Sequence, residues 1–178
     1  MPGETQWVDA SLLEGLFVKG MVVDPQLEAK LLEIGYNLRR PEAKYTQQVF
    51  QRCIAVAGTH LFPNETPALA QRELGRRLVD GFSKTLLGSV MLAILPHVPP
   101  AVVINRLPRW FKATSSSTDA RVEVVGPTER RLSMPTQPDS DAMPDLLCGI
   151  FERLIRGWTA IEIVTHSPQE TVYRIAWK

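Results

Sequence analysis

The sequence is poor in the side chains that most often carry chemistry. It contains two cysteines, Cys53 and Cys148, and three histidines in 178 residues. Neither cysteine has the short spacing to a second cysteine or histidine that a zinc site or a redox motif needs. Each lies on an apolar stripe, so we expect both to be buried free thiols that pack as small hydrophobic side chains. Such thiols favour a reducing, cytoplasmic location.

Motifs for catalysis and cofactor binding are also missing. No Gly-x-Ser-x-Gly nucleophile elbow occurs, and no glycine-rich loop joins a predicted strand to a predicted helix. The histidines, His60, His97 and His166, are far apart in the sequence, so we predict no metal site and no cofactor. His60 or His97 could ligate haem, but no second motif supports that alternative.

The chain has almost no excess of charge. The formal net charge is +1, with 13 basic and 10 acidic residues in 1–112 and 7 basic and 9 acidic residues in 113–178. Neither part is a basic module, which argues against a nucleic-acid partner. The N-terminus also lacks the charged and apolar regions of a secretory signal.

No apolar run is suited to crossing a membrane. The longest charge-free stretch, Thr85–Asn105, has 21 residues, but Pro96, Pro99 and Pro100 interrupt it. A membrane-spanning helix needs about 20 predominantly apolar residues in one piece. We therefore predict no membrane association and expect this stretch to form part of the interior.

Residues 1–112 read as mainly helical. Apolar spacing favours a helix over roughly Trp7–Lys19, with an extended alternative for its end. Asp24-Pro25 and Thr66-Pro67 combine a capping side chain with proline at the first helical position, and Thr46 is a third predicted cap. Gly35 is the predicted end of the helix that starts at Pro25.

The longest predicted helix covers about Pro67–Leu95. Its first half is amphipathic, and its second half, being apolar all round, is expected to be buried all round. Gly75, Gly81 and Gly88 predict either close packing of another element against this helix or a bend. A shorter helix begins at Pro99-Pro100 and is expected to kink or end at Pro108.

Residues 113–178 change to the period-two pattern of strands. Strands are predicted over Arg121–Val125, Arg131–Met134, Ala160–His166 and Thr171–Trp177, with a helix over Asp145–Arg156. The proline-rich stretch Pro135–Pro144 reads as a mobile loop. The fold class is therefore α+β, with an N-terminal helical layer followed by β-β-α-β-β in a four-stranded antiparallel sheet. We expect residues 1–178 to form a single domain, in which the long helix packs under the sheet.

One cluster of residues is typical of a binding site. It interleaves cations with aromatic side chains: Arg106, Arg109, Trp110, Phe111 and Lys112. Such a cluster can bind an anionic ligand or a partner. The alternative is an amphipathic helix whose aromatic side chains pack in the core while its cations stay in water.

Several short motifs together resemble a known family. They occur in the order Gly35-Tyr36-Asn37-Leu38, Ala43-Lys44-Tyr45, Leu61-Phe62-Pro63, the LGRR-x-x-x-GF block at Leu74–Phe82, Leu107–Phe111 and Val172–Trp177. The chain resembles an uncharacterised paralogous family of cytosolic proteins expanded in myxobacteria. The layout is similar to that of haem-NO-binding and vinyl-reductase-like sensor folds. The Tyr-x-Ser-x-Arg motif of the haem-binding members is absent, which argues against haem.

These features favour a non-enzymatic binding or sensor-like module for a small ligand or a partner protein. The alternative is an interaction or oligomerisation adaptor, such as a homodimer, with Trp7, Trp110 or Trp177 as interface anchors. An enzyme whose site is assembled from scattered residues is a third reading.

Overall fold

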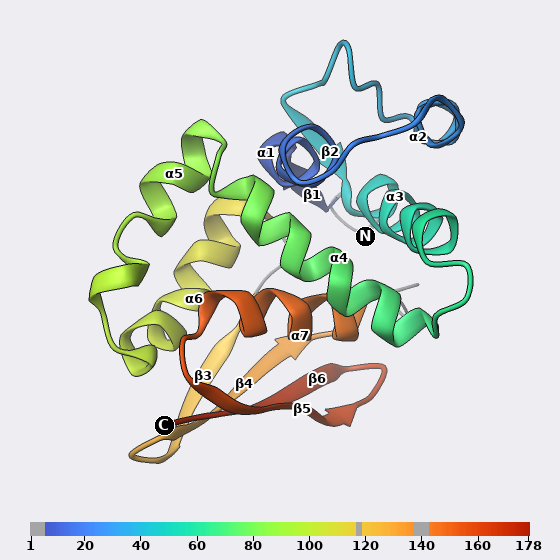
Figure 1. The fold of residues 1–178 in the computed structure, drawn as a ribbon. Helices are drawn as coiled ribbons and strands as arrows, with labels where there is room; N and C mark the ends of the chain where they lie inside the picture. Colours follow the sequence, from blue (N-terminus) through green and yellow to red (C-terminus); the bar gives the residue numbers. More distant parts are fainter. Residues whose placement is uncertain (1–5, 117–118, 137–142) are drawn as a thin grey trace, which may run out of the picture.

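The computed structural model describes residues 6–116, 119–136 and 143–178 (Figure 1). Helical elements dominate the first two thirds of these residues. In chain order the elements are β1 (Trp7–Asp9), α1 (Ala10–Glu14), η1 (Gly15–Lys19), α2 (Pro25–Ile34), β2 (Lys44–Thr46), α3 (Gln47–Leu61), α4 (Pro67–Phe82), α5 (Leu86–Leu92), η2 (Leu95–His97), α6 (Pro100–Thr114), β3 (Arg121–Gly126), β4 (Glu129–Pro135), α7 (Met143–Leu154), β5 (Trp158–His166) and β6 (Glu170–Trp177).

The first segment differs from the single helix predicted for it. Trp7–Asp9 pairs antiparallel with β2, so the helix starts only at Ala10. The Asp9 side chain caps it by accepting a hydrogen bond from the backbone N–H of Ser11 at 2.9 Å. From Gly15 the helix widens into a π-helical turn, η1, which packs against α4.

The predicted caps of the next three helices are confirmed. Asp24, Thr46 and Thr66 cap α2, α3 and α4 with their side chains. Gly35 ends α2 with φ 108°, a conformation that favours glycine.

The predicted helix over Pro67–Leu95 is wrong in one respect, because it is broken after Phe82. Thr85 is extended and its hydroxyl accepts a hydrogen bond from the N–H of Gly88 at 3.0 Å, so a new helix, α5, begins at Leu86. A Cβ at Gly88 would lie 1.8 Å from the carbonyl oxygen of Phe82, so only glycine fits this break. The expected burial of the second half is also wrong, since Leu86 is 87% exposed.

Of the two alternatives predicted for Pro108, a kink or an end of the helix, the end is wrong. Pro108 lies inside α6, which continues to Thr114. The helix thus continues for six residues, 109–114, beyond the proline.

The C-terminal β-β-α-β-β order is confirmed, with one four-stranded antiparallel sheet of strand order β3-β4-β6-β5. The predicted loop Pro135–Pro144 falls largely on residues 137–142, outside the described part of the chain. One face of the sheet is polar, and there Arg174 forms ion pairs with Glu129 at 2.9 Å and Glu162 at 3.2 Å.

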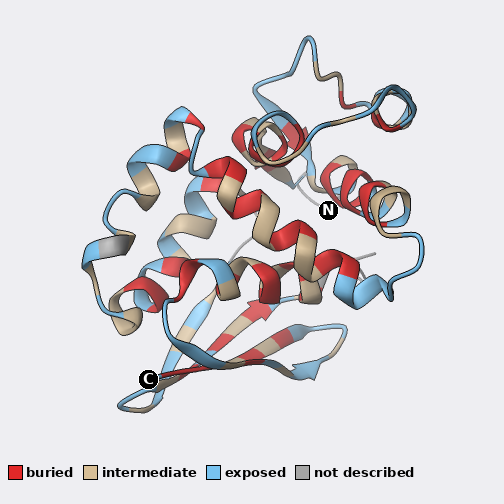
Figure 2. Cartoon of the chain, in the orientation of Figure 1, coloured by how far each residue is buried: buried red, intermediate tan, exposed pale blue. Residues whose placement is uncertain are grey.

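Helix α7, not α4, covers the other face of the sheet, which corrects the expected position of the long helix (Figure 1). α4 lies on top of α7, and both helices carry buried residues (Figure 2). The two helices approach closely at Gly75 and Gly149. A Cβ at Gly75 would lie 2.2 Å from the carbonyl oxygen of Leu146. On its other side α4 meets η1, where a Cβ at Gly81 would lie 1.7 Å from the carbonyl oxygen of Gly15. The prediction of close packing against glycines is therefore confirmed for α4.

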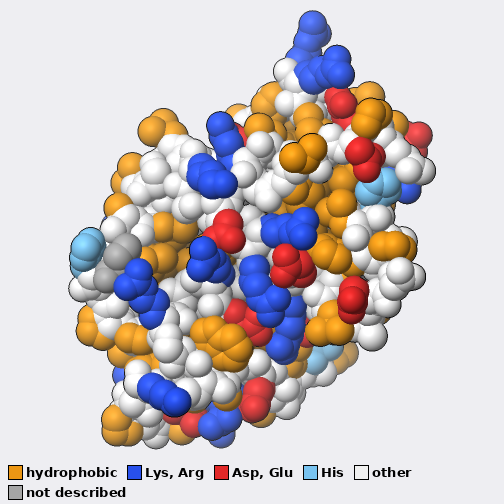
Figure 3. All heavy atoms as spheres, in the orientation of Figure 1, with side chains coloured by type: hydrophobic (Ala, Val, Ile, Leu, Met, Phe, Trp, Pro, Cys, Tyr) orange, Lys and Arg blue, Asp and Glu red, His pale blue; other side chains and the backbone are white. Residues whose placement is uncertain are grey.

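Ion pairs join α4 to α7 at the surface. Glu152, whose side chain is 4% exposed, lies 3.2 Å from Arg72 and 2.6 Å from Arg76. Figure 3 shows the acidic and basic side chains side by side along this face.

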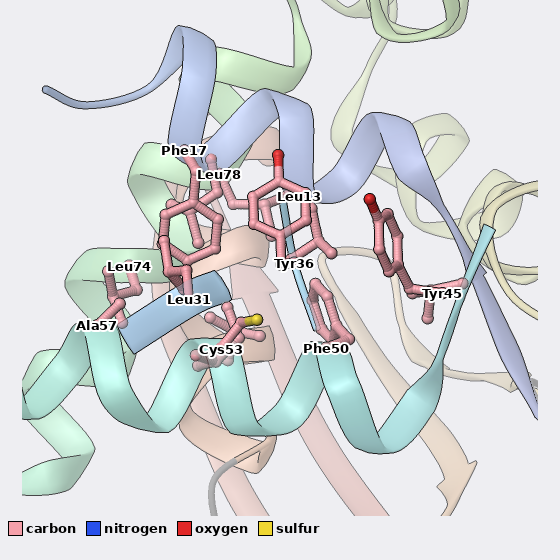
Figure 4. Close-up of a cluster of buried hydrophobic side chains, with 14 of the residues drawn as sticks. Leu13, Phe17, Leu31, Tyr36, Tyr45, Phe50, Cys53, Ala57, Leu74 and Leu78 are labelled. Atoms are coloured by element: carbon pink, nitrogen blue, oxygen red, sulfur yellow. The ribbon is translucent and has the colours of Figure 1, made fainter. Parts of the chain in front are cut away.

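The buried apolar side chains form two clusters that meet at α4. The N-terminal cluster consists of residues from β1, α1, η1, α2, β2, α3 and α4 with Tyr36 and Leu146. The ring of Tyr36 contacts the rings of Phe17 and Tyr45 (Figure 4). The C-terminal cluster consists of residues from α6, α7 and the sheet with Val79 of α4. Cys53 is buried in the first cluster and Cys148 in the second, both as free thiols, as predicted.

None of the described helices is long and apolar enough to cross a membrane.

Candidate functional site

A cavity of about 150 Å³ lies where the two clusters meet. Residues from β1, α1, α3, α4, α5, α6, β4, α7 and β6 contribute to its wall. The lining residues are Val8, Leu12, Gln47, Phe50, Leu78, Val79, Phe82, Met91, Leu92, Leu107, Trp110, Phe111, Thr114, Ser115, Met134, Pro135, Thr136, Pro144, Leu146, Leu147, Ile150, Leu154, Thr171 and Tyr173.

Both hydrophobic clusters contribute side chains to the wall. Phe50, Leu78 and Phe82 belong to the N-terminal cluster, whereas Leu107 and Tyr173 belong to the C-terminal cluster. Phe50 and Leu78 can be followed in Figure 4 at the inner side of α3 and α4. A molecule held in the cavity would therefore contact both clusters at once.

The described lining residues include no Asp, Glu, Lys, Arg, His or Cys. Their polar groups are one amide, one phenol, one indole N–H and four hydroxyls, at Gln47, Tyr173, Trp110, Thr114, Ser115, Thr136 and Thr171. Transferring an unpaired charge into such a site is very unfavourable. The wall therefore suits an uncharged, largely apolar molecule.

Most of the hydroxyls are already engaged within the protein. The Thr114 hydroxyl donates to the carbonyl of Trp110 at 3.1 Å. The Thr171 hydroxyl lies 2.8 Å from His166 Nδ1 and 3.3 Å from the Thr136 hydroxyl. These bonds leave the threonine methyl groups available to contact a molecule in the cavity.

Gln47 differs from the threonines. Its Oε1 is buried and has no hydrogen-bond partner in the described structure. The backbone N–H of Gln47 donates to the carbonyl of Gln6 at 2.9 Å, which fixes the start of α3 beside β1. Gln47 lines the cavity, but its side-chain oxygen is buried in the protein and is not exposed to the cavity.

Tyr173 lies under the cavity, between the sheet and α7. Its ring contacts Phe151 edge-on at a centroid distance of 5.3 Å. Burial raises the pKa of the Tyr173 hydroxyl well above its ordinary value, and the nearby Cys148 and Asp145 raise it further. The phenol is therefore protonated at neutral pH.

The cluster predicted on α6 is divided by the helix. Trp110 and Phe111 line the cavity, whereas Arg106, Arg109 and Lys112 are exposed. Lys112 lies 3.4 Å from Asp119, an exposed ion pair. The structure thus places only the aromatic members of the predicted cluster at the cavity.

The histidines lie elsewhere. His60 Nε2 is 2.8 Å from Asp24 Oδ2, His166 contacts Thr171, and His97 is exposed in η2. No group of three or more His, Cys, Asp or Glu within the described residues is arranged to hold a metal ion.

Sequence reasoning missed most of the cavity wall, because the wall is assembled from nine elements. Leu78 and Val79 were one local indication of a site between two clusters. Adjacent residues on a helix point in different directions, so two adjacent apolar side chains contact different neighbours. Gln47 gave no signal, because a glutamine at the start of a helix is ordinary.

The fold is similar to that of solved H-NOX structures. One comes from a study of the molecular mechanism of H-NOX activation (TM-score 0.66, 12% identity, covering 95% of this chain and 94% of that one). A second comes from a study of haem distortion in the H-NOX family (0.63, 13%, 95% and 92%). A third is an oxygen-binding H-NOX domain related to soluble guanylate cyclases (0.63, 14%, 95% and 90%). No curated protein matches the sequence.

The described cavity residues do not fit haem. Haem iron is held by His, Cys, Met or Tyr, and neither His nor Cys lines this cavity. Tyr173 is a protonated phenol, and Met91 and Met134 lack a histidine opposite them. No Lys or Arg among the lining residues could pair with the haem carboxylates. The volume, about 150 Å³, equals that of an engineered cavity that binds benzene or xenon.

The expected resemblance to a sensor fold is confirmed at the level of the fold, and the sequence match defines the family. Residues 6–178 match the family model described as Protein of unknown function (DUF2378), and the chain belongs to that family.

Proposed function

We propose that this chain is a non-enzymatic, sensor-like module that holds a small uncharged molecule in the cavity between its two hydrophobic clusters. The observation that carries the proposal is the position of the cavity, whose wall is divided between the clusters and has no charged residue among those described. A bound molecule would add apolar contacts to both clusters and so stabilise their arrangement.

The proposal treats residues 1–178 as one cytoplasmic domain that works without a cofactor. Trp110 and Phe111 of the predicted α6 cluster contribute aromatic surface to the cavity. Arg106, Arg109 and Lys112 lie outside it, where they suit an anionic partner surface better than a ligand in the cavity.

Thermal unfolding with toluene as the probe tests the proposal. A ligand that binds only the native state stabilises it by about 2.7 kcal/mol at a hundredfold excess over its Kd. We expect toluene to raise the Tm of the wild type in a concentration-dependent way. Unchanged Tm values with toluene and with other uncharged molecules of that size would contradict the proposal.

Filling the cavity provides the matched test. Leu78→Trp places an indole in the cavity wall and should abolish the effect of toluene, whereas Leu69→Trp lies on the same helix, outside the cavity, and should retain it. Overpacking costs about 1–3 kcal/mol. If Leu78→Trp does not fold, the smaller insertion Leu92→Phe serves the same purpose.

An adaptor is the second candidate function, favoured by a different observation. Leu86 and Val90, one turn apart on α5, are 87% and 72% exposed in a stretch that carries no charge. Two of the three anchors expected from the sequence are less suitable, because Trp177 is 8% exposed and Trp110 lines the cavity. Light scattering of the wild type and of a Leu86→Lys/Val90→Lys variant tests for a dimer that this face would form. Two strictly monomeric samples would exclude it.

A further inference from the structure

One edge of the four-stranded sheet suits a second copy of this chain. We propose that two copies pair antiparallel through β3 (Arg121–Gly126), about a two-fold axis at Val122, so that their sheets join into one. This surface lies apart from the site of the proposed function, since no residue of β3 is among the described residues that line the cavity.

β3 is an edge strand that a second strand can reach. Among the described strands it has one neighbour, β4, because the strand order is β3-β4-β6-β5 (Figure 1). Helix α6 lies beside β3 but leaves four of its residues exposed: Arg121, Glu123, Val124 and Val125. An edge strand carries backbone N–H and C=O groups that are free to pair with another strand.

The charges on β3 are self-complementary. Arg121 and Glu123 lie on the polar face of the sheet, because Val122 between them pairs with Leu132, which is buried under α7 on the other face. Within the described residues, no ion pair joins Arg121 or Glu123 to another side chain. In two antiparallel copies centred on Val122, Arg121 of each copy lies opposite Glu123 of the other. An axis at Arg121 or at Glu123 would instead place two like charges opposite each other, so the charge pattern selects Val122.

The same register covers an exposed apolar side chain. Val124 shares a face with Val122 and is 67% exposed. In the paired strands it lies opposite Ala120 of the other copy, and Ala120 packs against the C-terminal cluster. Removing Val124 from water favours association. The apolar face of the sheet thus continues across the axis.

The other edge strand, β5, lacks such a pattern. Its register against β6 shifts twice, as at β-bulges, which hinder the addition of a further strand. Between the two shifts it carries one charged residue, Glu162, which already pairs with Arg174 at 3.2 Å. β3 has one shift, beside the turn, and pairs with β4 without interruption from Arg121 to Val124. We therefore place the contact on residues 121–124.

The contact is short, so the expected dimer is weak. Stable interfaces bury about 1,200–2,000 Å², more than one pair of short strands provides. We expect a Kd of about 10⁻⁴ M, measured by sedimentation velocity at protein concentrations from about 10⁻⁶ to about 10⁻³ M. A protein that stays monomeric over that range would overturn the proposal.

Disulfide trapping tests the register. Opposite residues of antiparallel strands have Cα atoms about 4.5–5.5 Å apart, within the range of a disulfide. A mixture of Arg121→Cys and Glu123→Cys proteins should therefore form a mixed disulfide dimer on oxidation, while keeping the second Arg121–Glu123 pair. In either variant alone the introduced thiols lie on residues about 8 Å apart, so we expect about tenfold less dimer. The native cysteines are buried and do not interfere. Equal crosslinking of the single variants would overturn the register.

Charge reversal tests the ion pairs. Arg121→Glu puts carboxylates opposite each other at both symmetrical positions and should raise the Kd about tenfold. Arg121→Glu/Glu123→Arg exchanges the charges and should return the Kd to within about threefold of the wild type. Thr165→Glu is the control, because it adds a carboxylate to the same face of the sheet at the opposite edge. A dimer that Arg121→Glu leaves unchanged, or that the exchange does not restore, would overturn the proposal.

A last variant separates β3 from the exposed face of α5. Leu86→Lys/Val90→Lys leaves β3 intact and should dimerise as the wild type does. Loss of the dimer in this variant would place the contact on α5 and overturn the proposal. Because β3 does not line the cavity, neither the dimer nor its absence changes the expected effect of toluene, so the two proposals fail separately.

Discussion

The two hydrophobic clusters have similar contents but different frameworks. Each contains a group of contacting aromatic rings and one buried free cysteine. The N-terminal cluster is held by helices and a two-stranded ribbon, whereas the C-terminal cluster lies on a four-stranded sheet. Helix packing depends on side-chain contacts, and a sheet adds a ladder of backbone hydrogen bonds. The cavity lies at the boundary, where neither framework determines the packing alone.

Removing one ring from each cluster should have the largest effect. Phe17→Ala and Phe151→Ala each delete a fully buried ring and should lower the free energy of unfolding by about 3–5 kcal/mol in urea titrations. If the clusters unfold together, tryptophan fluorescence and circular dichroism will report the same midpoint for each variant. Separate midpoints in either variant would show that the clusters are independent.

The reactivity of the two buried cysteines measures how well each cluster excludes reagents from solvent. Burial raises the pKa of Cys53 to about 12 and that of Cys148 to about 11. Arg52 acts in the opposite direction on Cys53, as Arg72 does on Cys148, where Asp145 and Glu152 add to the rise. The thiolate is the reactive form. At pH 8 we expect iodoacetamide to modify neither cysteine in the native protein and both cysteines in the unfolded protein, which peptide mass spectrometry would measure. Fast labelling of Cys53 at pH 8 would contradict its burial.

The glycines on the two sides of α4 should have an intermediate effect. Gly75→Ala brings a methyl group against the backbone of α7, and Gly81→Ala brings one against η1. We expect each to cost about 1–3 kcal/mol of unfolding free energy, because backbone atoms must move. Gly126→Ala is the control, with nothing within 4 Å of the added carbon. A Gly75→Ala variant as stable as this control would mean that α4 and α7 are further apart.

The smallest effect belongs to Asp24, at the edge of the N-terminal cluster. Hydrogen bonds from His60 and from the backbone N–H of Leu27 lower the pKa of the Asp24 carboxyl below its ordinary value. Because folding lowers this pKa, the charged carboxylate stabilises the folded protein at pH values above the pKa of the unfolded chain. This stabilisation is lost as the pH falls through the lower pKa of the folded protein. We expect the Tm difference between wild type and Asp24→Asn to shrink as the pH is lowered from 5 to about 2. A difference that stays constant over that range would contradict the role of the charged carboxylate.

The secondary structure of residues 113–178 was predicted better than that of residues 1–112. Period-two alternation in Thr171–Trp177 and turn residues between strands are local signals, and they gave the sheet with small errors at the ends. The break at Thr85 was missed because an uninterrupted apolar pattern continued across it. The exposure of Leu86 depends on what packs against α5, which no local pattern records.

The candidate site could be predicted only in part for the same reason. Trp110 and Phe111 were singled out by their aromatic character, and both line the cavity. Gln47 and Tyr173 come from elements more than a hundred residues apart, so their meeting is a property of the tertiary fold. The expansion of the family in myxobacteria stays a prediction.

A crystal of the protein pressurised with xenon tests the central claim most directly, because xenon binds apolar cavities of this size. We expect a xenon atom between the clusters, in contact with Phe82, Leu107 and Tyr173. Electron density that shows these side chains collapsed onto one another, with no xenon between them, would contradict the account.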